Sequence, residues 1–134
     1  MAKKIVHVVA CALVDIDGRV LLAKRPEGKS MADLWEFPGG KIEQGETPEA
    51  AIVRELSEEL AIDTKSSCLA PLSFVSHEYD DFHLVMLLYV CRRWWGTPQP
   101  VVASDLAWVR APRLGDYAMP PADKPLISAL QDLL

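Results

Sequence analysis

The sequence predicts an α+β fold, in which strands form a sheet and helices pack against it. Two observations lead to this prediction. Segments rich in β-branched residues alternate with turn signals, and two further segments carry apolar residues at helical spacing. With 134 residues, half of them hydrophobic and a quarter charged, the chain can bury one core. We therefore expect residues 1–134 to form a single domain.

Extended segments are expected in the first part of the chain. Residues 5–14 are rich in Val and Ala, and an apolar run at 19–25 follows the turn signal of Gly18, so we expect these two segments to pair. After a polar loop, residues 34–37 form a short extended piece. It ends in a turn at residues 38–40, Pro-Gly-Gly, where the backbone can approach a ligand closely.

A helix is expected from Pro48 to about Leu60. The Thr47 hydroxyl can cap the first turn, and proline is well tolerated at the first helical position. Ile52, Leu56 and Leu60 recur every four residues and form an apolar stripe that should pack on the sheet. The opposite side of this helix is then free for chemistry.

More strands and a second helix are expected in the rest of the chain. Residues 72–77 and 82–92 have the composition of strands around an acidic turn, and residues 106–109 form a last short strand. Residues 125–134 carry apolar residues at helical spacing, so the chain should end in an amphipathic helix.

Charge and composition exclude several kinds of partner. The net charge of −5 argues against a surface that binds nucleic acid polymers, because such surfaces neutralise many phosphates. No segment approaches the ~20 apolar residues of a membrane span. The three cysteines are widely spaced and are expected as free thiols, which indicates a cytoplasmic location.

Three carboxylates lie on one face of the first expected helix. Glu55, Glu58 and Glu59 stand at positions i, i+3 and i+4, where like charges repel unless a cation offsets them. Mg²⁺ prefers such hard oxygen ligands, and Mn²⁺ is a substitute, although acidic clusters are more often a solvated helix face. Arg54 and Glu46 are placed to form an ion pair that orients the glutamates.

The spacing of these residues resembles the Nudix box, the metal- and diphosphate-binding motif of the Nudix hydrolases. The matching positions are Gly40, Glu46, Arg54-Glu55-Leu56, Glu58-Glu59 and Ile62. The resemblance implies the Nudix fold, an α/β/α sandwich with a mixed β-sheet between helices. It also implies hydrolysis of a nucleoside diphosphate linked to another group.

Residue roles follow from the same resemblance. It implies that Glu55, Glu58 and Glu59 bind the metal together with the Gly39 carbonyl, and that Glu55 and Glu58 serve catalysis. Arg54 and Glu46 would orient the glutamates.

The chain departs from the family pattern at two positions. Ala61 stands where the box has glycine, and alanine can adopt the left-handed helix end at a cost of about 1 kcal/mol. Val102 occupies the position of an acidic residue that joins the metal site or acts as a base. Either the nearby Asp105 substitutes, or the helix glutamates suffice.

Outside the box, the chain resembles the MutT branch of the family over nearly its whole length. The similarity is carried by Arg25, residues 34–43 and 45–50, the turn at 81–83, the loop at 94–98 and residues 120–125. That branch removes oxidised guanine nucleotides, chiefly 8-oxo-dGTP, from the nucleotide pool. The resemblance implies that Arg25, Phe37 and Asp81 lie around the nucleoside and that Asp123 faces the base.

Asp123 leaves the choice of base open, because MutT has asparagine at this position. A protonated Asp123 can donate to O6 of 8-oxoguanine and accept from its N7–H, whereas an ionised one only accepts, for example from cytosine N4–H₂. Cytidine triphosphate pyrophosphohydrolases of the family carry aspartate in this motif. A structural alternative is that Asp123 caps the last helix.

Three hypotheses follow. The first is an 8-oxo-dGTP diphosphatase, and the second is a (d)CTP or pyrimidine triphosphate pyrophosphohydrolase. The third is a Nudix-fold nucleotide-binding domain without turnover, against which the intact charged positions of the box argue. The partner in each case is a small nucleotide, bound by a monomer or a weak homodimer.

Overall fold

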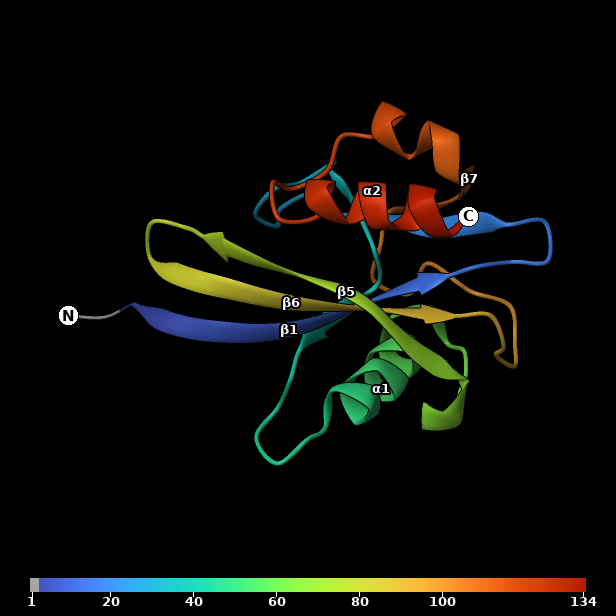
Figure 1. The fold of residues 1–134 in the computed structure, drawn as a ribbon, viewed down its shortest axis with the longest axis horizontal. Coiled ribbons are helices and arrows are strands. Elements are labelled where there is room, and N and C mark those ends of the chain that lie inside the picture. Colours follow the sequence, from blue (N-terminus) through green and yellow to red (C-terminus); the bar gives the residue numbers. More distant parts are fainter. Residues whose placement is uncertain (1–2) are drawn as a thin grey trace.

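The computed structural model describes residues 3–134 and confirms the α+β fold (Figure 1). Its elements in chain order are β1 (Lys4–Leu13), β2 (Arg19–Lys24), β3 (Trp35–Glu36), β4 (Gly39–Lys41), α1 (Pro48–Leu60), the 3₁₀ turn η1 (Ser66–Cys68), β5 (Leu69–Glu78), β6 (Phe82–Cys91), β7 (Asp105–Arg110), the 3₁₀ turn η2 (Ala111–Asp116) and α2 (Lys124–Leu133). Within residues 3–134, neither helix is long and apolar enough to cross a membrane.

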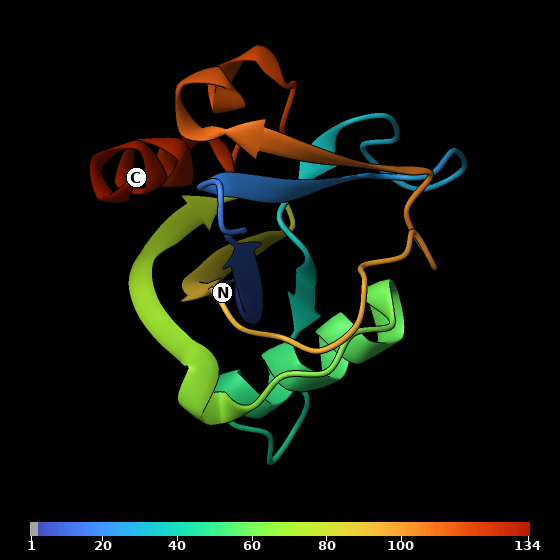
Figure 2. The same ribbon diagram turned by 90° about the vertical axis from the view of Figure 1, so that its right-hand side faces the viewer.

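The strands divide between two sheets. A mixed four-stranded sheet has the order β4-β1-β6-β5, with β1 and β6 parallel, and an antiparallel three-stranded sheet has the order β3-β2-β7. The four-stranded sheet lies between α1 on one side and α2 on the other, and Figure 2 shows β2 and β7 on the side of α2. The sheet between helices that the family resemblance implies is therefore present.

The expected pairing of the first two strands is wrong. The two segments are joined by a turn, in which the Asp15 N–H donates to the Arg19 carbonyl, and by a single bridge between Val14 and Val20, but β1 and β2 belong to different sheets. The reason is that β6 pairs with β1 along its whole length, while β4 and the Pro38 carbonyl occupy the other edge of its second half. β2 therefore finds its partners in β3 and β7.

The Pro-Gly-Gly segment is also not the expected turn. Gly39–Lys41 forms strand β4, which pairs with Val8–Ala10 of β1. A Cβ atom on Gly39 would lie 2.0 Å from the Val9 carbonyl oxygen, so only glycine allows the two strands to come this close. The segment that was expected to approach a ligand is thus fixed at the edge of the sheet.

Helix α1 has the predicted limits and the predicted buried stripe. The Thr47 hydroxyl accepts a hydrogen bond from the Ala50 N–H at 3.1 Å, and the helix begins at Pro48. The apolar face of α1 is fully buried against one face of β1 and β6. This face consists of Ala51, Ile52, Leu56 and Leu60. The acidic side of α1 is thereby directed toward β4, on which it packs.

Ala61 ends helix α1 in the left-handed conformation, with φ 56° and ψ 37°. Its N–H donates to the Ser57 carbonyl at 3.1 Å, and the Ile62 N–H donates to the Leu56 carbonyl at 3.4 Å. Ala61 therefore ends the helix in the same conformation that the glycine of the family motif would adopt, although alanine carries a Cβ.

Ala61→Gly is expected to raise the free energy of unfolding by about 1 kcal/mol, because glycine adopts this conformation without the steric penalty. Urea unfolding followed by circular dichroism measures the change. Ala50→Gly, at an exposed position inside α1, is the matched control and should lower the free energy by about 1 kcal/mol. A loss of stability in Ala61→Gly would contradict the assignment.

Candidate active site

Arg54 is the centre of a hydrogen-bond network on the exposed side of α1. Its Nε and Nη2 donate to the two carboxylate oxygens of Glu46 at 2.8 and 2.9 Å, which confirms the expected ion pair. Its Nη1 donates to Glu55 at 2.7 Å and lies 3.3 Å from Glu58, and Nη2 also donates to the Lys41 carbonyl at 3.0 Å. The hydrogen bonds from Arg54 lower the pKa of Glu46 to about 2. One guanidinium thus fixes the loop before α1, the helix and β4 relative to one another.

Glu55 and Glu59 come together beside the two glycines of β4. The Gly39 N–H donates to Glu59 Oε2 at 3.2 Å. A Cβ on Gly40 would lie 2.7 Å from the Glu55 carboxylate, so this glycine leaves the space that the carboxylate fills. Burial, and then the negative charge of Glu55, raise the pKa of Glu59 to about 8. The negative charge of Glu55 and Glu59 is therefore not fully compensated by the positively charged and hydrogen-bonding groups of the protein around them.

These residues fit a hard divalent cation. The donors beside Gly39 are all oxygens, and a cation there would offset the repulsion that raises the pKa of Glu59. The side chain of Glu58 is 60% exposed and is directed to Arg54. No group of three Asp, Glu, His or Cys side chains in residues 3–134 is arranged tightly enough to hold an ion. Metal binding by the three glutamates and the Gly39 carbonyl remains a prediction.

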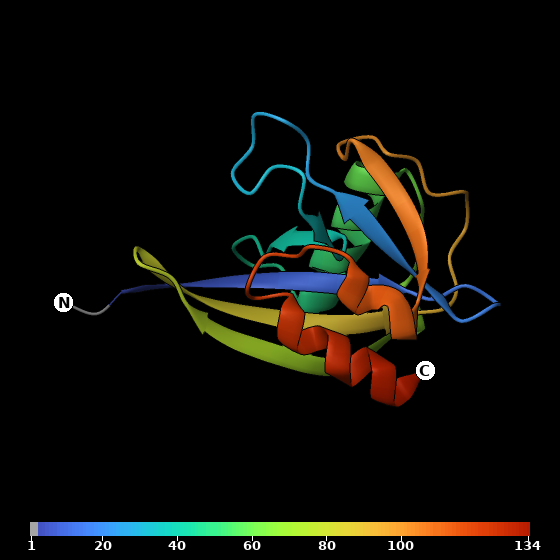
Figure 3. The same cartoon turned by 90° about the horizontal axis from the view of Figure 1, so that it is seen from above.

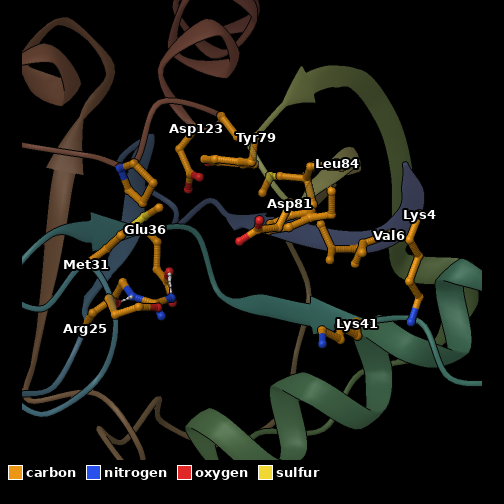
Figure 4. Close-up of a pocket in the computed structure, with 16 residues that line it drawn as sticks. Lys4, Val6, Arg25, Met31, Glu36, Lys41, Tyr79, Asp81, Leu84 and Asp123 are labelled. Carbon is orange, nitrogen blue, oxygen red and sulfur yellow. Dashed lines mark hydrogen bonds and ion pairs between the residues drawn. The ribbon is translucent and has the colours of Figure 1, made fainter. Parts of the chain in front are cut away.

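A cavity of about 470 Å³ opens on the α2 side of the four-stranded sheet (Figure 4). Arg25, Asp81 and Asp123, three of the four residues expected around the nucleoside, line it. The fourth, Phe37, lines an adjoining cavity of about 170 Å³ that also reaches Gly39 and Gly40. The structure thus gathers these residues around a space that leads from Asp123 to the glycine strand beside the glutamates.

Asp123 is buried and does not cap α2. The residue is 3% exposed and its side chain makes no capping hydrogen bond, so the capping alternative is wrong. The backbone N–H of Phe37 lies close enough to this carboxyl to lower its pKa. Burial, and then the charge of Glu36, raise the pKa of Asp123 to about 7, against the opposing effect of Arg25. Both protonation states of this group are therefore populated near neutral pH.

Sequence reasoning missed Glu36 as a residue of the cavity. Its carboxylate accepts a hydrogen bond from Arg25 Nη1 at 2.7 Å, and the two side chains lie together at one side of the cavity (Figure 4). Arg25 Nε also donates to the Ser30 carbonyl at 2.8 Å and so holds the loop between β2 and β3. The only signal for Glu36 was an acid between two aromatic residues in a short extended segment.

The loop that contains Val102 lies along the end of α1. The N–H groups of Gln99 and Val101 donate to the carbonyls of Leu60 and Glu59, at 2.9 and 3.2 Å. Val102 itself is exposed, and the Asp105 carboxylate accepts from the Leu106 N–H at 2.8 Å. The loop is therefore fixed next to Glu59, and whether Asp105 serves as a base stays a prediction.

The family model of the NUDIX domain matches residues 9–129. The chain belongs to the Nudix family. This Nudix hydrolase is 35% identical to the 8-oxo-dGTP diphosphatase of Escherichia coli K12, over 87% of the chain and 89% of that protein. It is 37% identical to the CTP pyrophosphohydrolase of the same organism, over 97% of the chain and 94% of that protein.

A solved structure places the hydrolase within the family. A MutT structure, from a study of the Aliivibrio salmonicida and Vibrio cholerae proteins, superposes with a TM-score of 0.81 at 30% identity, over 98% of the chain and all of that protein. The chain is thus a MutT-type Nudix hydrolase.

Proposed function

We propose that this MutT-type Nudix hydrolase converts 8-oxo-dGTP to the monophosphate and pyrophosphate, using Mg²⁺ or, as a substitute, Mn²⁺. Glu55, Glu58, Glu59 and the Gly39 carbonyl would hold the metal. The observation that supports this substrate best is the buried, readily protonated carboxyl of Asp123 in a cavity that adjoins the glutamates. The resemblance to an 8-oxo-dGTP diphosphatase over most of the chain agrees with it.

The chemistry is the cleavage of one phosphoanhydride bond by water. A water oxygen forms a bond to phosphorus, the bridging P–O bond breaks, and the leaving oxygen keeps its electron pair. When bound, the divalent cation neutralises phosphate charge and makes water more acidic. Arg54 holds Glu55 and Glu58 in place through Nη1, and its bidentate pair with Glu46 prevents the guanidinium from turning away.

Base selection is assigned to Asp123. A protonated Asp123 donates its O–H to O6 of the oxidised guanine, and its other oxygen accepts from the N7–H, which ordinary guanine lacks. Besides Asp123, six titratable side chains line the same cavity: Lys4, Arg25, Glu36, Lys41, Tyr79 and Asp81. Among them the negative charge of Glu36 favours the protonated form and the positive charge of Arg25 opposes it.

A second candidate is a (d)CTP pyrophosphohydrolase. The resemblance to the CTP pyrophosphohydrolase of E. coli favours it, and so does the second protonation state of Asp123. An ionised Asp123 accepts a hydrogen bond from cytosine N4–H₂ and cannot donate to O6 of a purine. The two candidates therefore need opposite protonation states of one residue.

This difference gives an experiment: the ratio of kcat/KM for 8-oxo-dGTP to kcat/KM for dCTP, measured from pH 6 to pH 8.5. Because the pKa of Asp123 is raised to about 7, its carboxyl is protonated below this pH and ionised above it. We expect the ratio to exceed one at pH 6 and to fall by about tenfold for each unit that the pH rises, because it follows the ratio of protonated to ionised Asp123. The titration of any group that affects both substrates equally cancels in this ratio.

Asp123→Asn is the control variant, since asparagine donates and accepts at every pH. Its ratio should stay high and independent of pH. A wild-type ratio below one throughout the range would favour the pyrimidine enzyme, and a ratio that does not change with pH would contradict the role of Asp123. Failure to hydrolyse any nucleotide with Mg²⁺ would support a binding domain without turnover.

We further propose that residues 1–134 act as one catalytic domain, as a monomer or weak homodimer in the cytoplasm. The substrate is then a free nucleotide of the precursor pool, and its removal prevents incorporation of the oxidised base into DNA. The three cysteines are unpaired thiols, in agreement with a reducing compartment.

A further inference from the structure

Tyr79 is held in place at the turn between β5 and β6. Its backbone N–H donates to the Phe82 carbonyl at 2.9 Å, and its own carbonyl accepts from Lys3 Nζ at 2.8 Å. The Tyr79 ring stacks on the ring of Phe82, with 5.0 Å between the ring centres, and makes a T-shaped contact with His77 at 4.7 Å. The side chain is therefore positioned by contacts that do not use its hydroxyl group.

The hydroxyl of Tyr79 lies at the Asp123 end of the large cavity. Figure 3 shows that the β5–β6 turn extends beyond the end of α2 that Asp123 precedes. Both residues line the cavity, and Figure 4 shows their side chains next to each other. Burial raises the pKa of Tyr79 above its usual value, the nearby Ala122 N–H opposes this, and the negative charge of Asp123 adds to it. The hydroxyl is therefore close to both groups and keeps its proton at neutral pH.

The position of Tyr79 relative to the two cavities suits a contact with the base. Asp123 lines both the large cavity and the adjoining one, which reaches Gly39 and Gly40 beside the glutamates. Tyr79 lines the large cavity but not the adjoining one, in the part of the chain that the structure describes. If the glutamates hold the metal, the phosphates lie toward the glycines. The Tyr79 hydroxyl then meets the base and not the phosphates.

A hydrogen-bond donor beside Asp123 matches an atom that oxidation adds to guanine. Along one edge of 8-oxoguanine, O6, the N7–H and O8 follow one another. A protonated Asp123 donates to O6 and accepts from the N7–H, so the next group along this edge is O8, which is an acceptor. The phenol O–H of Tyr79 is a donor, and unlike the carboxyl of Asp123 it does not lose its proton near neutral pH.

We propose that Tyr79 is a specificity-determining residue whose hydroxyl donates a hydrogen bond to O8 of the oxidised base. The inference rests on the proposed function and deepens it, because ordinary guanine has a C–H in place of O8 and cannot accept this bond. 8-Oxoguanine differs from guanine at two neighbouring atoms, N7 and C8. Asp123 would recognise the change at N7, and Tyr79 the change at C8.

Tyr79→Phe tests the proposal, because phenylalanine keeps the ring and its stacking and removes only the hydroxyl. Binding of 8-oxo-dGMP and dGMP is measured by calorimetry in EDTA at pH 6. We expect the Kd of 8-oxo-dGMP to rise about fivefold, which is about 1 kcal/mol, and the Kd of dGMP to stay within about twofold. Tyr117→Phe is the matched control, since Tyr117 packs against Trp35 and lines neither cavity, and it should leave both Kd values unchanged.

A second background separates a direct contact from an effect on the protonation of Asp123. In Asp123→Asn the residue at this position does not titrate, and Tyr79→Phe should still raise the Kd of 8-oxo-dGMP about fivefold. Loss of the effect in this background, equal weakening of 8-oxo-dGMP and dGMP, or no weakening of either would overturn the proposal.

The failure of this proposal can be distinguished from the failure of the proposed function by adding dCMP to the comparison. Tighter binding of dCMP than of 8-oxo-dGMP by the wild type would contradict the proposed function. A wild-type preference for 8-oxo-dGMP that Tyr79→Phe leaves unchanged would contradict only the role of Tyr79.

Discussion

Glu58→Gln is expected to lower kcat at least about a hundredfold, equivalent to about 2.7 kcal/mol of transition-state stabilisation. The amide has nearly the shape of the carboxylate but lacks the negative charge that a divalent cation requires. Steady-state kinetics with 8-oxo-dGTP and Mg²⁺ measure the change. Because the Glu58 side chain is 60% exposed and its contact with Arg54 is long, at 3.3 Å, the melting temperature should stay within about two degrees.

Glu78→Gln provides the comparison for this prediction. The Glu78 side chain is 68% exposed, similar to Glu58, and it pairs with Lys3 at the end of β5. This substitution removes one negative charge from a similar environment away from α1, and turnover should be unaffected. Comparable losses in the two variants would mean that overall charge, and not the box, governs the rate.

Gly40→Ala is expected to abolish most activity while the fold survives. Its Cβ would lie 2.7 Å from the Glu55 carboxylate, which is the flexible end of a side chain and can move away. That movement would break the 2.7 Å contact of Glu55 with Arg54 and displace a proposed metal ligand. We expect kcat/KM to fall at least about thirtyfold, or about 2 kcal/mol, with little change in the urea midpoint.

Gly39→Ala should instead lower the stability of the fold. Its Cβ would meet the carbonyl oxygen of Val9 at 2.0 Å, and this backbone atom belongs to the central strand β1. The pairing of β4 with β1 must then open, so the loss should appear as a lower melting temperature or insoluble protein. Gly115→Ala, where a Cβ meets nothing within 4 Å, controls for the substitution itself. Full activity in Gly40→Ala would contradict the placement of Glu55.

Local signals explain why α1 could be predicted from the sequence. The Thr47 cap, the first-turn proline and the four-residue apolar period act within one segment, and they gave the limits Pro48 and Leu60. Strand partners depend instead on contacts between distant segments. β1 pairs with β6, more than seventy residues later. The hairpin signal at Gly18 gives the turn and the single bridge between Val14 and Val20, but the pairing extends no further because the edges of β1 are already occupied.

In the site, too, contacts within one segment could be predicted from the sequence, and contacts between distant segments could not. The network of Arg54 with Glu46 and Glu55 lies within ten residues of chain and follows from the box. The environment of Asp123 does not, because its raised pKa depends on burial and on the charge of Glu36, which lies far earlier in the sequence. The family resemblance placed Asp123 near the base, but only the folded chain shows that its protonation is balanced near neutral pH.

The central claim is that the glutamates of α1 bind divalent cations beside a bound nucleotide. A Mn²⁺ titration followed by electron paramagnetic resonance, with nucleotide present, measures this directly on the wild type and Glu58→Gln. The account predicts that the wild type sequesters Mn²⁺ and that the variant binds it at least about tenfold more weakly. Equal binding by the two proteins, or no binding by the wild type, would contradict it.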